Sequence, residues 1–136
     1  MNELRTFEDL ECWKACRELR IFAAKVCKGL PKEEEYRLKD QILRSARSTT
    51  ANIAEGYGRF HYQENIQYCR HARGSAYEVW DHFITGADEN LIAEAALSEC
   101  QILVEKSVQL LNGYIRYLSL PPSLPPTNFT WKGGPS

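Results

Sequence analysis

Apolar residues recur every three or four positions along most of the chain, and this spacing places them on one face of an α-helix. The first run consists of Leu10, Trp13, Cys16, Leu19, Ala23, Val26 and Leu30, and the second of Leu38, Ile42, Ala46, Thr49, Ile53 and Tyr57. The third consists of Ile66, Cys69, Ala72, Ala76, Trp80, Phe83 and Ala87, and the fourth of Leu91, Ala95, Ile102, Leu110, Tyr114 and Leu118. No window alternates apolar and polar residues with a period of two, so the pattern predicts an all-α protein.

Residues that start or stop helices separate these runs. Gly29 and Pro31 predict the end of the first helix. Acidic side chains favour the positive end of the helix dipole, so residues 33–35 predict the start of the second helix and residues 88–90 the start of the fourth. Long helices with short connections predict an antiparallel up-down four-helix bundle over residues 1–118.

The composition changes after the fourth run. Residues 120–126 read Leu-Pro-Pro-Ser-Leu-Pro-Pro, which cannot continue a helix and favours an extended polyproline II or disordered chain. We therefore expect residues 119–136 to form a Pro-rich, mobile C-terminal tail. Its aromatic residues Phe129 and Trp131 allow an alternative, in which the tail docks on the bundle or on a neighbouring subunit.

A chain of 136 residues has the length of one ordinary domain. Its 43% hydrophobic and 26% charged residues are typical of a soluble globular protein. The sequence has neither a run of about 20 apolar residues nor an apolar signal region. We therefore expect a cytoplasmic protein that does not associate with a membrane.

Five cysteines are present, an odd number with no Cys-x-x-Cys motif. Cys12 and Cys16 share a helix face and would supply half of a zinc site, but no second pair follows at ligand spacing. We expect buried structural thiols, and no disulfide, metal site or cofactor.

Basic residues are concentrated in the middle of the chain, although 17 basic and 18 acidic residues give the whole chain a formal net charge of −1. Residues 37–73 contain seven basic and three acidic residues. Tyr62 and Tyr68 are available there for stacking, so the segment is a candidate nucleic-acid interface on the second and third helices. Its proposed binding residues are Arg37, Arg44, Arg47, Arg59, Arg70 and Arg73. The alternative is that these arginines pair with carboxylates such as Glu55 and Glu78.

Two polar strings interrupt the apolar faces of the second and third helices. They contribute Asn52, Glu55, Gly56, Arg73, Gly74, Ser75 and Glu78. We expect their polar side chains to form a buried hydrogen-bond network between the two helices, and Gly74 to allow a close helix approach. No histidine or nucleophile lies at helical spacing within the strings, and the duplicated Glu-x-x-His of di-metal bundles is absent, so we expect no enzymatic activity.

Three motifs together resemble a known family. Residues 7–15 (FEDLECWKA) resemble its opening F-x-D-L-x-x-W-x-x-A signature. Residues 41–59, with QILRSARS, ANIAEG and Gly-Arg, resemble its central motif, and residues 72–78 (ARGSAYE) its third-helix motif. The family consists of four-helix bundle proteins encoded in intervening sequences of bacterial 23S ribosomal RNA genes, and the resemblance covers about residues 7–118.

The resemblance implies an antiparallel four-helix bundle that assembles into a homopentameric ring, in a family whose biochemical activity is not established. The matching residues are Arg44, Asn52, Glu55, Gly56, Arg59, Arg73, Gly74, Ser75 and Glu78. A more distant relative is the accessory protein of diversity-generating retroelements, a basic pentamer that binds nucleic acid and a reverse transcriptase.

The chain departs from the family at Thr49–Thr50, where an apolar residue and proline are usual, and at His61, where a serine cap is usual. It also departs from the retroelement relatives in its near-neutral charge.

Two hypotheses for the function follow. Five copies of the basic segment around a ring would concentrate positive charge, which favours binding of RNA or DNA. The alternative is a protein–protein scaffold without a nucleic-acid role, which the Pro-rich tail and the near-neutral charge favour.

Overall fold

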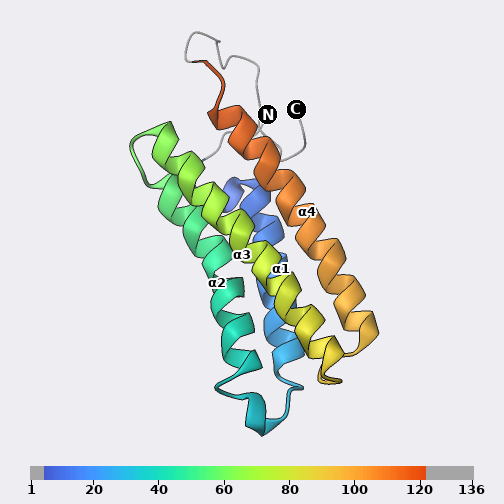
Figure 1. Cartoon of the computed structure of the whole chain (residues 1–136). Helices are drawn as coiled ribbons and strands as arrows, with labels where there is room; N and C mark the ends of the chain where they lie inside the picture. The colour runs from blue at the N-terminus through green and yellow to red at the C-terminus, as the bar shows by residue number, and fades with distance from the viewer. Residues whose placement is uncertain (1–4, 122–136) are drawn as a thin grey trace.

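Four long helices make up most of the computed structural model, which describes residues 5–121 (Figure 1). Within this range the elements are the 3₁₀ turn η1 (Phe7–Asp9), α1 (Glu11–Cys27), the 3₁₀ turn η2 (Lys32–Glu34), α2 (Leu38–Tyr57), α3 (Tyr62–Asp88) and α4 (Glu94–Leu118). No strand occurs among the described residues, so the all-α prediction is confirmed. The predicted mobility of the tail, with Phe129 and Trp131, concerns residues 122–136, which lie outside the described residues.

Each helix packs against two others. Helix α1 contacts α2 and α4, and α3 contacts the same two helices. The α1–α2 and α3–α4 connections lie at one end of the bundle, and the α2–α3 connection lies at the opposite end (Figure 1). Two apolar clusters fill the interior: one surrounds Phe83 and Ile42, and the other surrounds Ile53 and Leu111. No helix in the described part of the chain combines the length and the apolarity that a bilayer crossing requires.

The predicted starts of the second and fourth helices were wrong, and local hydrogen bonds explain why. Residues 32–34 form the separate turn η2, and α2 begins only at Leu38. The carboxylate of Glu34 caps the start of α2 although Glu34 precedes the helix. Its Oε1 accepts a hydrogen bond from the backbone N–H of Leu38 at 3.2 Å. Residues 88–90 end α3 instead of starting α4: Asn90 has a φ of 61°, and the N–H of Leu91 donates to the carbonyl of Gly86 at 2.8 Å.

The predicted buried face of the fourth helix was also partly wrong. Ile102 is 58% exposed, and Ala95 is exposed as well. The buried residues of α4 are Cys100, Leu103, Val104, Ser107, Val108, Leu111, Gly113, Tyr114 and Leu118. The run Ile-Leu-Val at 102–104 offers apolar side chains in adjacent directions, so helical spacing alone does not select which of them faces the core.

Candidate nucleic-acid interface

Two of the six predicted binding arginines form ion pairs within the chain. Arg44 Nε lies 3.8 Å from a carboxylate oxygen of Asp40. Arg59 lies 2.8 Å from Glu55 and 3.9 Å from Glu64, and it donates to the hydroxyl of Tyr68 at 2.6 Å. These contacts lie at the surface, where such pairs contribute little to stability, but they offset the positive charge of both arginines.

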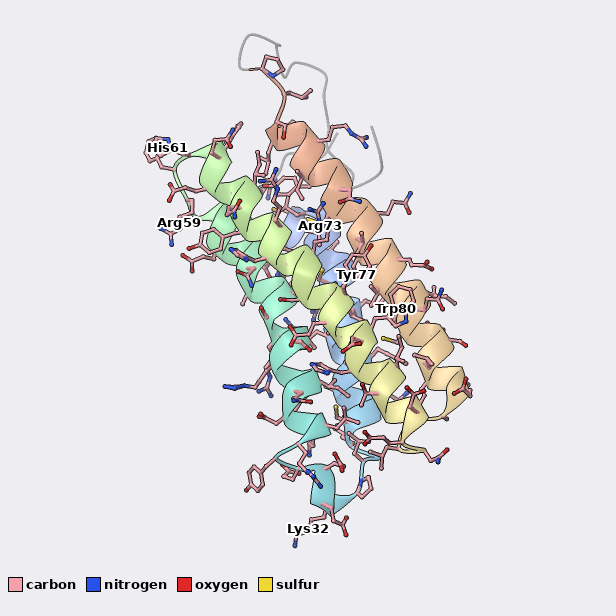
Figure 2. All side chains as sticks on the ribbon, viewed as in Figure 1. Lys32, Arg59, His61, Arg73, Tyr77 and Trp80 are labelled. Atoms are coloured by element: carbon pink, nitrogen blue, oxygen red, sulfur yellow. The ribbon has the colours of Figure 1, made fainter. Side chains whose placement is uncertain are left out.

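Two further predicted arginines, both on α3, donate hydrogen bonds to side-chain amides. Arg73 Nη1 donates to Oδ1 of Asn112 on α4 at 2.6 Å, and Arg70 donates to Gln67 at 3.3 Å. Figure 2 shows Arg73 between α3 and α4, whereas Arg59 lies at the α2–α3 connection. Arg37 precedes the first residue of α2 and is exposed. The six predicted arginines therefore do not form one strip along α2 and α3.

The polar strings meet at a smaller contact than the sequence predicts. Ser75 Oγ of α3 lies 2.8 Å from Ser48 Oγ of α2, and Asn52 Nδ2 donates to the carbonyl and to Oγ of Ser48, both at 2.8 Å. The side chains of Glu55 and Glu78 are 52% and 58% exposed. The expected buried network therefore does not reach either carboxylate, and Arg73 bonds to α4 instead. Ser48 was not predicted to take part.

The close approach expected at Gly74 occurs at a different glycine. A Cβ atom on Gly74 would meet nothing within 4 Å. A Cβ atom on Gly56 would lie 2.7 Å from Oδ1 of Asn65 and 2.8 Å from Cβ of Tyr68. Gly56 therefore permits the contact of α2 with α3, and Gly74 lies in open space on the outer side of α3.

The five thiols are buried, as the sequence predicts, and none of them is in a disulfide. Burial raises the pKa of Cys16 and of Cys69 to about 12 and that of Cys27 to about 11, so these thiols are protonated at neutral pH. Within residues 5–121, no three or more His, Cys, Asp or Glu side chains are grouped as metal ligands would be.

A groove between α1 and α2 carries arginines without acidic partners. Its volume is about 420 Å³, and it is lined by Arg20, Ile21, Ala24, Leu43, Ala46, Arg47 and Thr50. Arg20 Nη1 donates to Oγ1 of Thr50 at 2.8 Å, which fixes its guanidinium at the groove. Arg47 is exposed and pairs with no carboxylate among the described residues.

A third arginine extends this surface along α1. Arg17 lies three residues before Arg20, so the two share a face of the helix. Its guanidinium lies 5.9 Å from the ring centroid of Trp13, and no carboxylate in the described part of the chain pairs with it. The neighbouring Glu18 pairs with Lys106 of α4 at 3.3 Å and thus lies toward the other side of α1. We call the groove and the arginines at 17, 20 and 47 the α1–α2 basic groove.

The α1–α2 basic groove presents guanidinium N–H donors and no carboxylate, which suits a phosphate group. Sequence analysis found Arg47 but missed Arg17 and Arg20, because the basic residues of α1 are interrupted by Glu11 and Glu18 and form no continuous basic segment. A signal was available in the sequence, because Arg17 and Arg20 are three residues apart and therefore share a helix face on which Glu18 does not lie.

Comparison with known proteins gives a family match. The chain matches the family model described as "23S rRNA-intervening sequence protein" over residues 8–113, a range that includes the whole α1–α2 basic groove. A search of curated proteins finds no match.

Proposed function

The chain belongs to the 23S rRNA-intervening sequence protein family, and from this starting point we propose that it is a non-catalytic, oligomeric bundle that binds the phosphate backbone of RNA or DNA. The observation that carries this proposal is the α1–α2 basic groove. Its arginines have no carboxylate partner, whereas Arg44 and Arg59 already pair with acidic residues. Arginines without a carboxylate partner can use their positive charge and their guanidinium N–H donors to bind a polyanionic ligand.

Binding without catalysis is supported by the state of the reactive groups. The thiols are buried and protonated, and the carboxylates of Glu55 and Glu78 form surface pairs with Arg59 and His82. A cytoplasmic location is supported by the unpaired cysteines, since thiols remain reduced there.

The proposed assembly is a homopentameric ring of antiparallel, up-down bundles. The antiparallel order is supported by the short connections and by their alternation between the two ends of the bundle (Figure 1). Self-association is supported by exposed apolar residues on α3, where Tyr77 is 49% and Ile84 is 40% exposed. A ring would repeat the basic groove and raise the local positive charge.

A pair of double variants tests which arginines bind nucleic acid. Arg17→Ala with Arg47→Ala removes two unpaired charges of the groove, and Arg44→Ala with Arg70→Ala removes the same formal charge at two arginines outside the groove lining. We expect the groove variant to weaken binding of a structured RNA and of duplex DNA, and to reduce the salt slope of log K by about 0.7–0.9 for each phosphate contact that it removes. The second variant should bind like the unmodified protein. Equal weakening by both variants would contradict an interface at the groove.

A protein–protein scaffold is the second candidate function, and the exposed pair Tyr77 and Ile84 favours it. In that case Tyr77→Ser with Ile84→Ser would abolish capture of a protein partner, while the groove variant would leave that capture unchanged. Deletion of residues 119–136 would test the contribution of the tail.

A further inference from the structure

We infer that the α1–α2 basic groove binds an unpaired nucleotide of an RNA strand, with the base on its apolar lining and the phosphate on its arginines. The inference rests on the proposed function and narrows it to one class of nucleic acid. It starts from a feature that phosphate binding alone does not need, namely the exposed apolar part of the groove.

The lining of the groove is divided between polar and apolar side chains. Arg20, Arg47 and Thr50 form the polar part, and Arg20 is held by its hydrogen bond to Thr50. Ile21 and Leu43 form the apolar part with two alanines, and Ile21 is 53% exposed. A ligand that removes Ile21 from water while reaching both arginines must have an apolar surface next to an anionic group.

A nucleotide has this combination of groups. Its base has two flat faces of low polarity, and its phosphate accepts several hydrogen bonds from guanidinium groups. The groove volume of about 420 Å³ lies within the range of small-ligand sites, roughly 300–1,000 Å³. Arg17, one turn before Arg20 on α1, extends the positive surface toward a neighbouring phosphate of the same strand.

Only an unpaired base can reach the apolar lining. In a duplex the bases are stacked inside, so the α1–α2 basic groove of the protein would contact only the sugar–phosphate backbone. RNA exposes unstacked bases in loops, bulges and single strands, and proteins bind such bases by their faces. The divided groove therefore favours unpaired RNA over a duplex, whereas a surface of arginines alone would bind both.

Three labelled RNAs with the same number of phosphates test the inference by fluorescence anisotropy on the full-length protein. They are an unstructured single strand, the same strand with abasic sites, and a blunt duplex. We expect the single strand to bind at least about tenfold more tightly than either the abasic strand or the duplex. Equal affinity for all three would overturn the inference but leave the proposed function in place. Absence of binding to every RNA at low salt would overturn the inference, and absence of binding to duplex DNA as well would overturn the proposed function.

Two isoleucine variants complete the test. Ile21→Ser should remove the preference for the unpaired strand and leave duplex affinity unchanged, because the phosphate contacts remain. Ile102→Ser is the matched control, since Ile102 is 58% exposed but lies on α4 and outside the groove. A preference for the unpaired strand that survives in Ile21→Ser, or one that Ile102→Ser removes equally, would overturn the assignment of the base to the groove.

Discussion

Gly56 and Gly74 have opposite surroundings although both lie inside helices. Gly56 is buried where α2 meets α3, and Gly74 is exposed with nothing near its missing side chain. The sequence alone suggested the reverse for Gly74, because a glycine within a helix usually marks a packing or functional requirement. The distinction depends on which face of each helix is buried, and this is set by tertiary contacts.

These surroundings predict opposite effects of the same substitution. Gly56→Ala should destabilise the fold by about 1–3 kcal/mol, because the new methyl group would overlap Asn65 and Tyr68. Gly74→Ala should stabilise it by about 0.5–1 kcal/mol, because alanine favours the helix and meets no obstacle. Urea unfolding at one protein concentration measures both effects. A loss of stability in Gly74→Ala would show that another chain covers this part of α3.

The buried thiols predict a loss of stability at alkaline pH. Burial raises the pKa of Cys16 to about 12, above the ordinary value of about 8.5. Above pH 8.5 the unfolded chain releases thiol protons that the folded chain retains, so the free energy of unfolding falls as the pH rises. The slope is up to about 1.4 kcal/mol per pH unit for each thiol. Urea unfolding with reductant at several pH values between 8 and 11 measures the slope, and Cys16→Ala should make it shallower. A flat profile would contradict burial of the thiols.

Arginine partners were predictable only where they are close in sequence. Arg59, just beyond the end of α2, is four residues from Glu55, and this short separation by itself indicates an ion pair. The contact of Arg20 with Thr50 joins residues 30 positions apart, so it depends on how α1 and α2 pack. The part of the candidate site formed between helices could therefore not be predicted from spacing.

At the scale of the helices, the apolar spacing predicted the existence and order of all four. It was most reliable for the second helix, where Ile42, Ala46 and Ile53 are buried as predicted. The starts of α2 and α4 were predicted from acidic residues and were wrong, because side-chain and backbone hydrogen bonds around Glu34 and Asn90 decide where each helix begins. Such local bonds leave no periodic signal in the sequence.

The hydroxyl contact between α2 and α3 predicts a measurable coupling between the two helices. Ser48→Ala and Ser75→Ala should each destabilise the fold by about 0.5–1.5 kcal/mol, and the double variant should cost less than the sum, because both single changes remove the same 2.8 Å hydrogen bond. A double-mutant cycle by urea unfolding gives the coupling energy. Strict additivity would contradict the contact.

For the whole molecule, the formal net charge of −1 conceals an uneven surface. Carboxylates offset Arg44 and Arg59, while the α1–α2 basic groove retains its charge. Net charge alone therefore argues neither for nor against nucleic-acid binding in this protein. Repetition of the groove in an oligomer would strengthen its field without changing the charge of a single chain.

Binding of the full-length protein to a structured RNA over a salt series, with the mass in solution recorded on the same sample, tests the central claim most directly. If the arginines at 17, 20 and 47 each contact a phosphate, the slope of log K against log salt should be about −2 to −3 per protomer. Absence of binding at low salt, where electrostatic attraction is strongest, or an affinity that does not change with salt, would contradict the claim.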